Sequence, residues 1–224
     1  MHKKMDRKGK NTEQELAEIM RQEQEPGQWQ KLSLLCRMSV PSILSQVTSI
    51  IMQYIDAAMV GSLGADASAS IGVVSTSTWL LGGLCSAVST GFSVQAAHQI
   101  GAGNEDGARN VLKHGIVAAL IISSFLAGIG ALISRNLPVW LKADPAIQEQ
   151  ASGYFLVYVC SLPAVQCVSL CSGMLQSSGN MKTPSMLNAA MCFLDVFFNF
   201  IFISRFGVMG AALGTAMAEL TIAV

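Results

Sequence analysis

Charged residues are scarce in this chain: Asp, Glu, Lys and Arg together make up 12% of its 224 residues. A soluble domain carries about 25% charged residues, so the composition indicates a protein whose main solvent is lipid. The formal net charge is zero, and the sequence therefore predicts no nucleic-acid partner. A secretory signal is also missing, because the first 30 residues are polar and contain no apolar core segment.

No motif for a metal or nucleotide cofactor is present. The six cysteines all lie in apolar stretches without zinc-ligand spacing to a histidine, and we expect free thiols. The glycine-rich segment 99–108 lacks the Lys-Ser/Thr of a phosphate-binding loop and follows an apolar run instead of a strand. It predicts a tight turn, with Asn104 as the N-cap of the next helix. The sequence thus predicts no cofactor.

Long apolar runs dominate the rest of the chain after a polar tail at residues 1–31. Six runs are visible, at about 39–61, 69–95, 111–133, 154–174, 185–204 and 208–224. Each complete run has the roughly 20 residues of a spanning helix, and helices satisfy their own backbone in lipid. We predict an all-α membrane protein, with residues 32–224 forming a six-helix bundle. The last run is still apolar at Val224, which predicts a fragment or a chain that a second piece completes.

Basic residues predict the orientation of this bundle. With the tail on the cytoplasmic side, six basic residues lie near the inner surface: Arg21, Lys31, Arg37, Arg109, Lys113 and Lys182. Three lie near the outer surface: Arg135, Lys142 and Arg205. The excess of inner positive charge predicts a cytoplasmic N-terminus in the plasma membrane.

Two carboxylates lie in the middle of membrane-length runs. Asp56 belongs to the first run and Asp195 to the fifth. A charge at the centre of a bilayer costs roughly 2.5–3.5 kcal/mol on insertion scales. Such residues usually serve an ion or proton site inside a helical bundle, and we predict one here.

Polar stripes accompany these carboxylates at helical spacing. The first run carries Gln46, Ser49, Gln53 and Asp56; the fifth carries Asn188, Cys192, Asp195 and Asn199; the sixth carries Thr215 and Glu219. Three such stripes cannot all face lipid, so we expect them to face one another or a water-filled cavity. Interhelical hydrogen bonding is the alternative for Gln46, Ser49 and Asn188. Gly210-x-x-x-Gly214 predicts a close approach of two helices.

The predicted ligands suit two different ions. Carboxylate, amide and hydroxyl oxygens are hard ligands of the kind that Na⁺ prefers. A carboxylate held away from water beside a second carboxylate also binds a proton more readily. The sequence leaves Na⁺ and H⁺ open as the coupling ion.

Four motifs, in this order and spacing, resemble the multidrug and toxin extrusion (MATE) family. They are Asp56-Ala-Ala-Met-Val-Gly-Ser-Leu-Gly64, Gln99-Ile-Gly-Ala-Gly103, Gly173-Met-Leu-Gln-Ser-Ser-Gly-Asn-Met-Lys-Thr-Pro184 and Phe206-Gly-Val-Met-Gly-Ala-Ala-Leu-Gly-Thr215. The resemblance covers about residues 35–224. It implies the N-terminal lobe of a transporter built from two six-helix lobes, with the C-terminal lobe as a partner absent from this chain.

The resemblance also implies an activity and a site. Family members export cationic or amphipathic organic compounds in exchange for Na⁺ or H⁺ by alternating access. Some hold the cation with an aspartate of helix one, an Asn-x-x-x-Asp pair of helix five and a threonine of helix six. These positions match Asp56, the Asp195/Asn199 pair and Thr215, with Glu219 as an additional oxygen. The helix-five pair is reversed here, which moves its carboxylate by one turn and leaves the ion open.

Three other functions share features with this sequence. Flippases of lipid-linked glycans share the general architecture. An intramembrane aspartyl protease also uses two membrane aspartates, but Asp56 and Asp195 follow Ile55 and Leu194 and no Gly-x-Gly precedes the second. A membrane scaffold without transport would show no dependence of its stability on ions.

Overall fold

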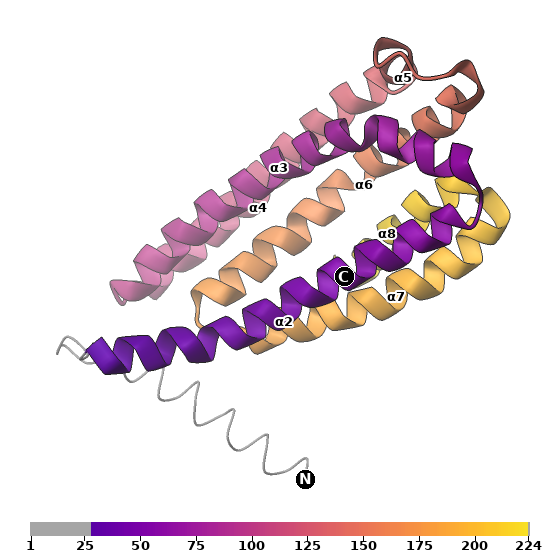
Figure 1. Ribbon diagram of the computed structural model, residues 1–224. Coiled ribbons are helices and arrows are strands. Elements are labelled where there is room, and N and C mark those ends of the chain that lie inside the picture. The colour runs from indigo at the N-terminus through magenta and orange to yellow at the C-terminus, as the bar shows by residue number, and fades with distance from the viewer. Residues whose placement is uncertain (1–27, 224) are drawn as a thin grey trace, which may run out of the picture.

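The computed structural model describes residues 28–223, so most of the predicted polar tail lies outside the described residues. Within this range the chain forms only helices (Figure 1), which confirms the all-α prediction. The helices are α2 (Gln28–Gly61), α3 (Ala65–Gly101), α4 (Glu105–Ile133), α5 (Leu137–Trp140), α6 (Pro145–Ser177), α7 (Lys182–Phe206) and α8 (Val208–Ala223).

The helices extend well beyond the predicted apolar runs. The α3 helix has 37 residues, or about 55 Å at ~1.5 Å per residue, against a hydrocarbon core of about 30 Å. Hydropathy marks only the part of a helix that lies in hydrocarbon, whereas polar ends stay helical when their first N–H groups are capped. The Asn104 side chain accepts a hydrogen bond from the Gly107 N–H at 2.9 Å, which confirms it as the N-cap of α4.

Four of the described helices, α3, α4, α6 and α7, are long and apolar enough to cross a membrane. The first and sixth predicted runs form α2 and α8, and α8 has 16 described residues, fewer than the roughly 20 of a full span. Large apolar side chains face outward from these helices, among them Phe125 and Phe193, which are 66% and 79% exposed. Lipid is the solvent that such a surface requires, so the chain is a multi-pass membrane protein.

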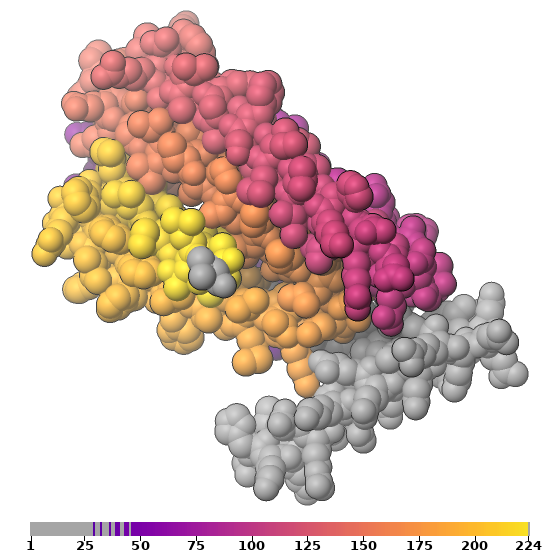
Figure 2. Space-filling model, turned by 180° about the vertical axis from the view of Figure 1, so that it is seen from behind, coloured from indigo at the N-terminus to yellow at the C-terminus, as the bar shows by residue number. Residues whose placement is uncertain are grey.

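Two groups of helices make up the bundle. The first consists of α3, α4 and α6, the second of α2, α7 and α8, and contacts between α6 and α8 join them. Figure 2, seen from behind, shows α6 in orange between α4 in magenta and α8 in yellow. The core of the first group is a buried cluster from α3 and α6 that includes Val74, Cys85, Phe155, Val159 and Leu162.

Hydrogen bonds from the part of α6 between Tyr158 and the end of the helix fix it to α3. The Tyr158 hydroxyl donates to the Thr78 carbonyl at 3.0 Å, and Gln166 Nε2 donates to Ser89 Oγ at 3.0 Å. Near the end of α6, Ser177 Oγ donates to the Ser93 carbonyl at 2.8 Å. Interhelical hydrogen bonds in membranes contribute about 0.6 kcal/mol each on average, and together with the buried apolar cluster they make α3 and α6 a firm wall of the bundle.

A single residue connects α7 to α8. Gly207 has φ 58° and ψ −132°, a conformation open to glycine but strained for residues with a Cβ. Beyond this turn, a Cβ on Gly210 would collide with the backbone carbonyl of Phe202. The close helix approach predicted for the Gly210 and Gly214 pair is therefore confirmed, and it is between α7 and α8.

Replacing Gly207 by Ala tests this connection. We expect Gly207→Ala to destabilise the folded chain by about 1–3 kcal/mol, because Ala pays the full strain of this backbone conformation. Thermal unfolding of the purified chain in detergent measures the loss. Gly128→Ala is the matched control, since a Cβ there meets no atom within 4 Å; equal melting temperatures for the two variants would contradict the expectation.

Candidate cation-binding site

The predicted carboxylates of the first and fifth runs meet in the structure. On α7, Asp195 and Asn199 lie one turn apart, and both side chains are fully buried, at 0% exposure. Asn199 Nδ2 donates to Asp195 Oδ2 at 3.0 Å and to Asp56 Oδ1 of α2 at 2.8 Å. One amide group thus bridges two carboxylates from different helices, and we call Asp56, Asp195 and Asn199 the carboxylate cluster.

In the described part of the chain, nothing basic balances the negative charge of this cluster. No Lys, Arg or His side chain in residues 28–223 pairs with Asp56 or Asp195. Asp195 Oδ1 and Asn199 Oδ1 are both buried without a hydrogen-bond partner. Unpaired buried charge costs several kcal/mol, so the cluster is suited to binding a cation or a proton.

Two residues from other helices complete the surroundings. Thr215 of α8 lies close to Asp195, and its hydroxyl donates to the Ala211 carbonyl at 3.2 Å. Tyr154 of α6 lies within electrostatic range of Asp56 and Asp195, and the sequence analysis did not single it out. It begins an apolar run without belonging to a polar stripe, so only the packing of α6 against α7 and α8 reveals it.

The ligand set of the cluster favours a hard monovalent cation. Its available atoms are carboxylate, carboxamide and hydroxyl oxygens, the donors that such ions take. Nowhere in residues 28–223 do three His, Cys, Asp or Glu side chains converge as a transition-metal site would require. All six cysteines are free thiols, as predicted. The orphan oxygens of Asp195 and Asn199 therefore fit Na⁺ or a proton.

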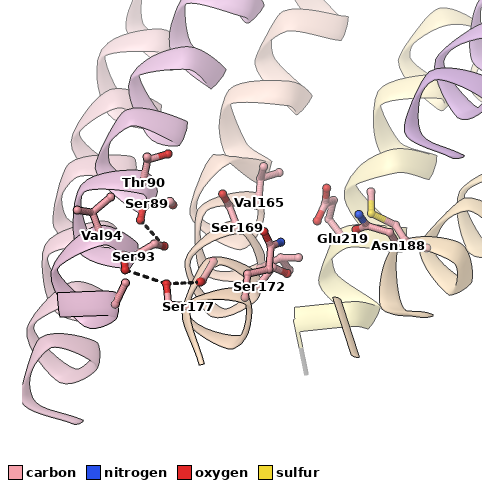
Figure 3. Close-up of a pocket in the computed structure, with 15 residues that line it drawn as sticks. Ser89, Thr90, Ser93, Val94, Val165, Ser169, Ser172, Ser177, Asn188 and Glu219 are labelled. Atoms are coloured by element: carbon pink, nitrogen blue, oxygen red, sulfur yellow. Dashed lines mark hydrogen bonds between the residues drawn. The ribbon is translucent and has the colours of Figure 1, made fainter. Parts of the chain in front are cut away.

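The other predicted site residues lie elsewhere. Gln46 and Gln53 are exposed on α2, and Ser49 is half-buried. Asn188 and Glu219 line a separate cavity of about 590 Å³ between α3, α6, α7 and α8 (Figure 3). One Glu219 carboxylate oxygen is buried there without a hydrogen-bond partner, so Glu219 does not join the carboxylate cluster through a hydrogen bond.

Comparison with known proteins decides the family. The profile of the MatE family matches residues 41–201. The chain belongs to the MatE family. The probable multidrug resistance protein NorM of Thermotoga maritima is 23% identical over 191 residues, which cover 83% of this chain and 41% of NorM.

Solved MATE structures share the fold of this chain. A MOP superfamily transporter from Pyrococcus furiosus, whose binding pocket is described as having reverse polarity, superposes with a TM-score of 0.80 at 23% identity. A multidrug resistance MATE transporter in its outward-facing conformation also gives 0.80 at 23%. Each comparison covers 84% of this chain and 42% of the solved one, so the chain spans less than half the length of the relatives it matches. MatE proteins are transporters and not enzymes, so the protease alternative is excluded.

Gly214 provides a test of the site in this MatE lobe. A Cβ on Gly214 would collide with Asn199 Oδ1, so we expect Gly214→Ala to push the carboxamide away from its two carboxylates. Overpacking of this kind costs about 1–3 kcal/mol, and thermal unfolding in detergent measures it. Gly72→Ala, where a Cβ meets nothing within 4 Å, is the control. A Gly214→Ala variant as stable as this control would show that the site tolerates the substitution.

Proposed function

We propose that this chain is the N-terminal half of a cation-coupled exporter of organic cations or amphipathic compounds. The observation that carries the proposal is the carboxylate cluster: two membrane aspartates from two helices, bridged by one amide and lacking a basic partner. Residues 32–224 form its lobe, and the partner is a second six-helix lobe. The relative lengths of this chain and the NorM relative support that arrangement.

The cluster couples ion binding to helix packing. It joins α2 to α7 through the hydrogen bond from Asn199 to Asp56. A cation or proton at Asp56 and Asp195 neutralises their mutual repulsion and changes how strongly α2 is held against α7. Alternating access follows if the ion has different affinities for the two packings of α2. A MATE relative with this fold has been solved in an outward-facing conformation, which supports the existence of one of the two states that alternating access requires.

The chemistry of the cavity supports a cationic substrate over an anionic one. Of the described residues that line it, none is basic, and Glu219 is acidic. A flippase of lipid-linked glycans carries a phosphate-linked substrate, and it would call for Lys or Arg at such a surface. Exposed Gln46 and Gln53 of α2 are then expected to face the central cleft between the two lobes, on the side that the second lobe covers.

Membrane orientation belongs to the same proposal. We place the protein in the plasma membrane with its N-terminus in the cytoplasm, because basic residues are more frequent at that end of the bundle. Lys182, Arg109 and Lys113 then lie on the cytoplasmic side, and Arg135, Lys142 and Arg205 lie outside.

Ion-dependent stability of the purified chain tests the cluster directly. A ligand at 100 times its Kd stabilises the folded state by about 2.7 kcal/mol, or several degrees in melting temperature for a chain of this size. We expect saturating Na⁺, or acidification if the ion is H⁺, to raise the melting temperature of the wild type. Asp56→Asn should abolish this increase, since it removes one of the two charges.

Glu149→Gln is the control for that measurement, because Glu149 is an exposed acid outside the apolar runs. This variant should keep the full ion-dependent increase. A wild type whose melting temperature responds to neither Na⁺ nor pH would favour the scaffold alternative and contradict the proposal.

Transport itself tests the role of Asp195. In cells that produce the chain together with its C-terminal lobe, Asp195→Asn should reach the membrane in normal amount yet lose efflux of a fluorescent organic cation by tenfold or more, taking about 1.4 kcal/mol as a tenfold change. Asp66→Asn, an exposed acid at the start of α3, should transport like the wild type. Full efflux by Asp195→Asn would refute the role assigned to this residue.

A further inference from the structure

The cavity between the two helix groups has a definite place in the bundle. It lies toward the end where α3 and α6 end and α7 begins, called the α6–α7 end. Its α3 and α6 walls run as far as Ala97 and Ser177, close to the last residues of both helices. Glu219 and Asn188 face α6 across this space (Figure 3). At about 590 Å³, the cavity far exceeds the ~10–15 Å³ that one water molecule needs.

Several hydroxyl groups of the cavity walls turn their oxygen lone pairs toward the cavity. Thr90 Oγ1 donates to the Ser86 carbonyl at 2.8 Å, and Ser93 Oγ donates to the Ser89 carbonyl at 2.8 Å. Ser177 Oγ likewise donates to backbone carbonyls. A hydroxyl has one hydrogen and two lone pairs, so each of these groups offers the cavity only acceptors. Together with the carboxylate of Glu219, the one charged side chain among the described lining residues, these lone pairs favour a cation over an anion.

Glu219 lies between this cavity and the carboxylate cluster. It lines the cavity, and it is also within electrostatic range of Asp195 on α7 and of Tyr158 on α6. The described residues of α3 that line the cavity are not ionisable. One Glu219 oxygen is buried without a hydrogen-bond partner, as is one oxygen of Asp195 in the cluster, so this oxygen is available to a cation.

We propose that the cavity is a cation vestibule, through which a small monovalent cation reaches Glu219 from the α6–α7 end. Glu219 binds the cation transiently before it passes to Asp195, and this binding position is distinct from the carboxylate cluster. The inference rests on the proposed function and extends it: ions enter or leave the cluster through this lobe, along a path separate from the cleft between the lobes. The cation is Na⁺ or a hydronium ion, which share the need for acceptor oxygens.

Thiol labelling of the full chain in membrane vesicles tests the vestibule. Ser172→Cys places a thiol in the α6 wall, and mass spectrometry of its peptide separates it from the six native cysteines. Two methanethiosulfonates are used, one carrying a trimethylammonium group and one a sulfonate. The rate at which each reacts with the introduced thiol is divided by its rate with free cysteine, and the ratio of the two values, cationic over anionic, is compared. We expect the cationic reagent to react about tenfold faster, because a nearby carboxylate attracts one and repels the other.

Glu219→Gln in the same background should bring this ratio close to one, whereas Asp56→Asn should leave it high. Replacing N-methylglucamine by Na⁺ at constant ionic strength should lower the ratio if the ion is Na⁺, and acidification alone should lower it if the ion is H⁺. A ratio near one in the Ser172→Cys chain, or one unaffected by Glu219→Gln, overturns the proposal, as does insensitivity to both Na⁺ and pH.

Sidedness provides the last comparison. The introduced thiol should react from the same side as Lys182→Cys, at the start of α7, and not from the side where Leu63→Cys reacts, between α2 and α3. Reaction only from the Leu63 side also overturns the proposal. If Asp56→Asn abolishes ion-dependent stability but labelling in the vestibule shows no charge preference, only this inference fails. If labelling shows the charge preference but Asp56→Asn keeps the ion-dependent stability, only the coupling role of the cluster is refuted.

Discussion

A single carboxamide, that of Asn199, connects the two acidic helices of this lobe. Its two N–H bonds serve two carboxylates, and its oxygen stays buried without a partner. An isolated pair of buried carboxylates would repel, and the amide holds them together without neutralising them. Polar contacts between membrane helices contribute about 0.6 kcal/mol on average. One bound ion can therefore alter this polar contact between α2 and α7, which is the property that a coupled transporter needs.

The rest of the bundle contrasts with this polar contact. Three hydrogen bonds and a buried apolar cluster fix α6 against α3 over most of their shared length. The α2 helix, in contrast, is joined to α7 by the hydrogen bond from Asn199 to Asp56. Because packed cores respond as units, movement in this lobe is expected to be concentrated in α2, with α3 and α6 acting as the fixed frame.

Sequence patterns predicted much of this architecture, for identifiable reasons. Apolar runs revealed the helices, because lipid demands continuous hydrophobicity, and a spacing of three and four residues grouped Asp195 with Asn199. The convergence of Asp56 with Asp195 followed from the cost of leaving either carboxylate in hydrocarbon. The N-cap at Asn104 was predictable because its contact is local.

What the sequence could not supply depends on how the helices pair and rotate. The four-residue helix α5 is too short for any periodicity, and it lies where a loop was expected. Tyr154 adjoins the cluster only because α6 packs against α7 and α8, and Glu219 lines a cavity only because α3, α6, α7 and α8 come together around it. Helix lengths were underestimated, since hydropathy does not report the polar turns outside the membrane.

The turn at Gly207 has a mechanical consequence for the whole lobe. With one residue joining α7 to α8, and Gly210 pressed against the backbone at Phe202, these helices have no slack with which to slide or separate. They form a rigid helical hairpin, with Asn199 on α7 and Glu219 on α8. A tilt of the α7–α8 hairpin as a rigid body therefore displaces Asn199 and Glu219 together, without any change in the packing of α7 against α8.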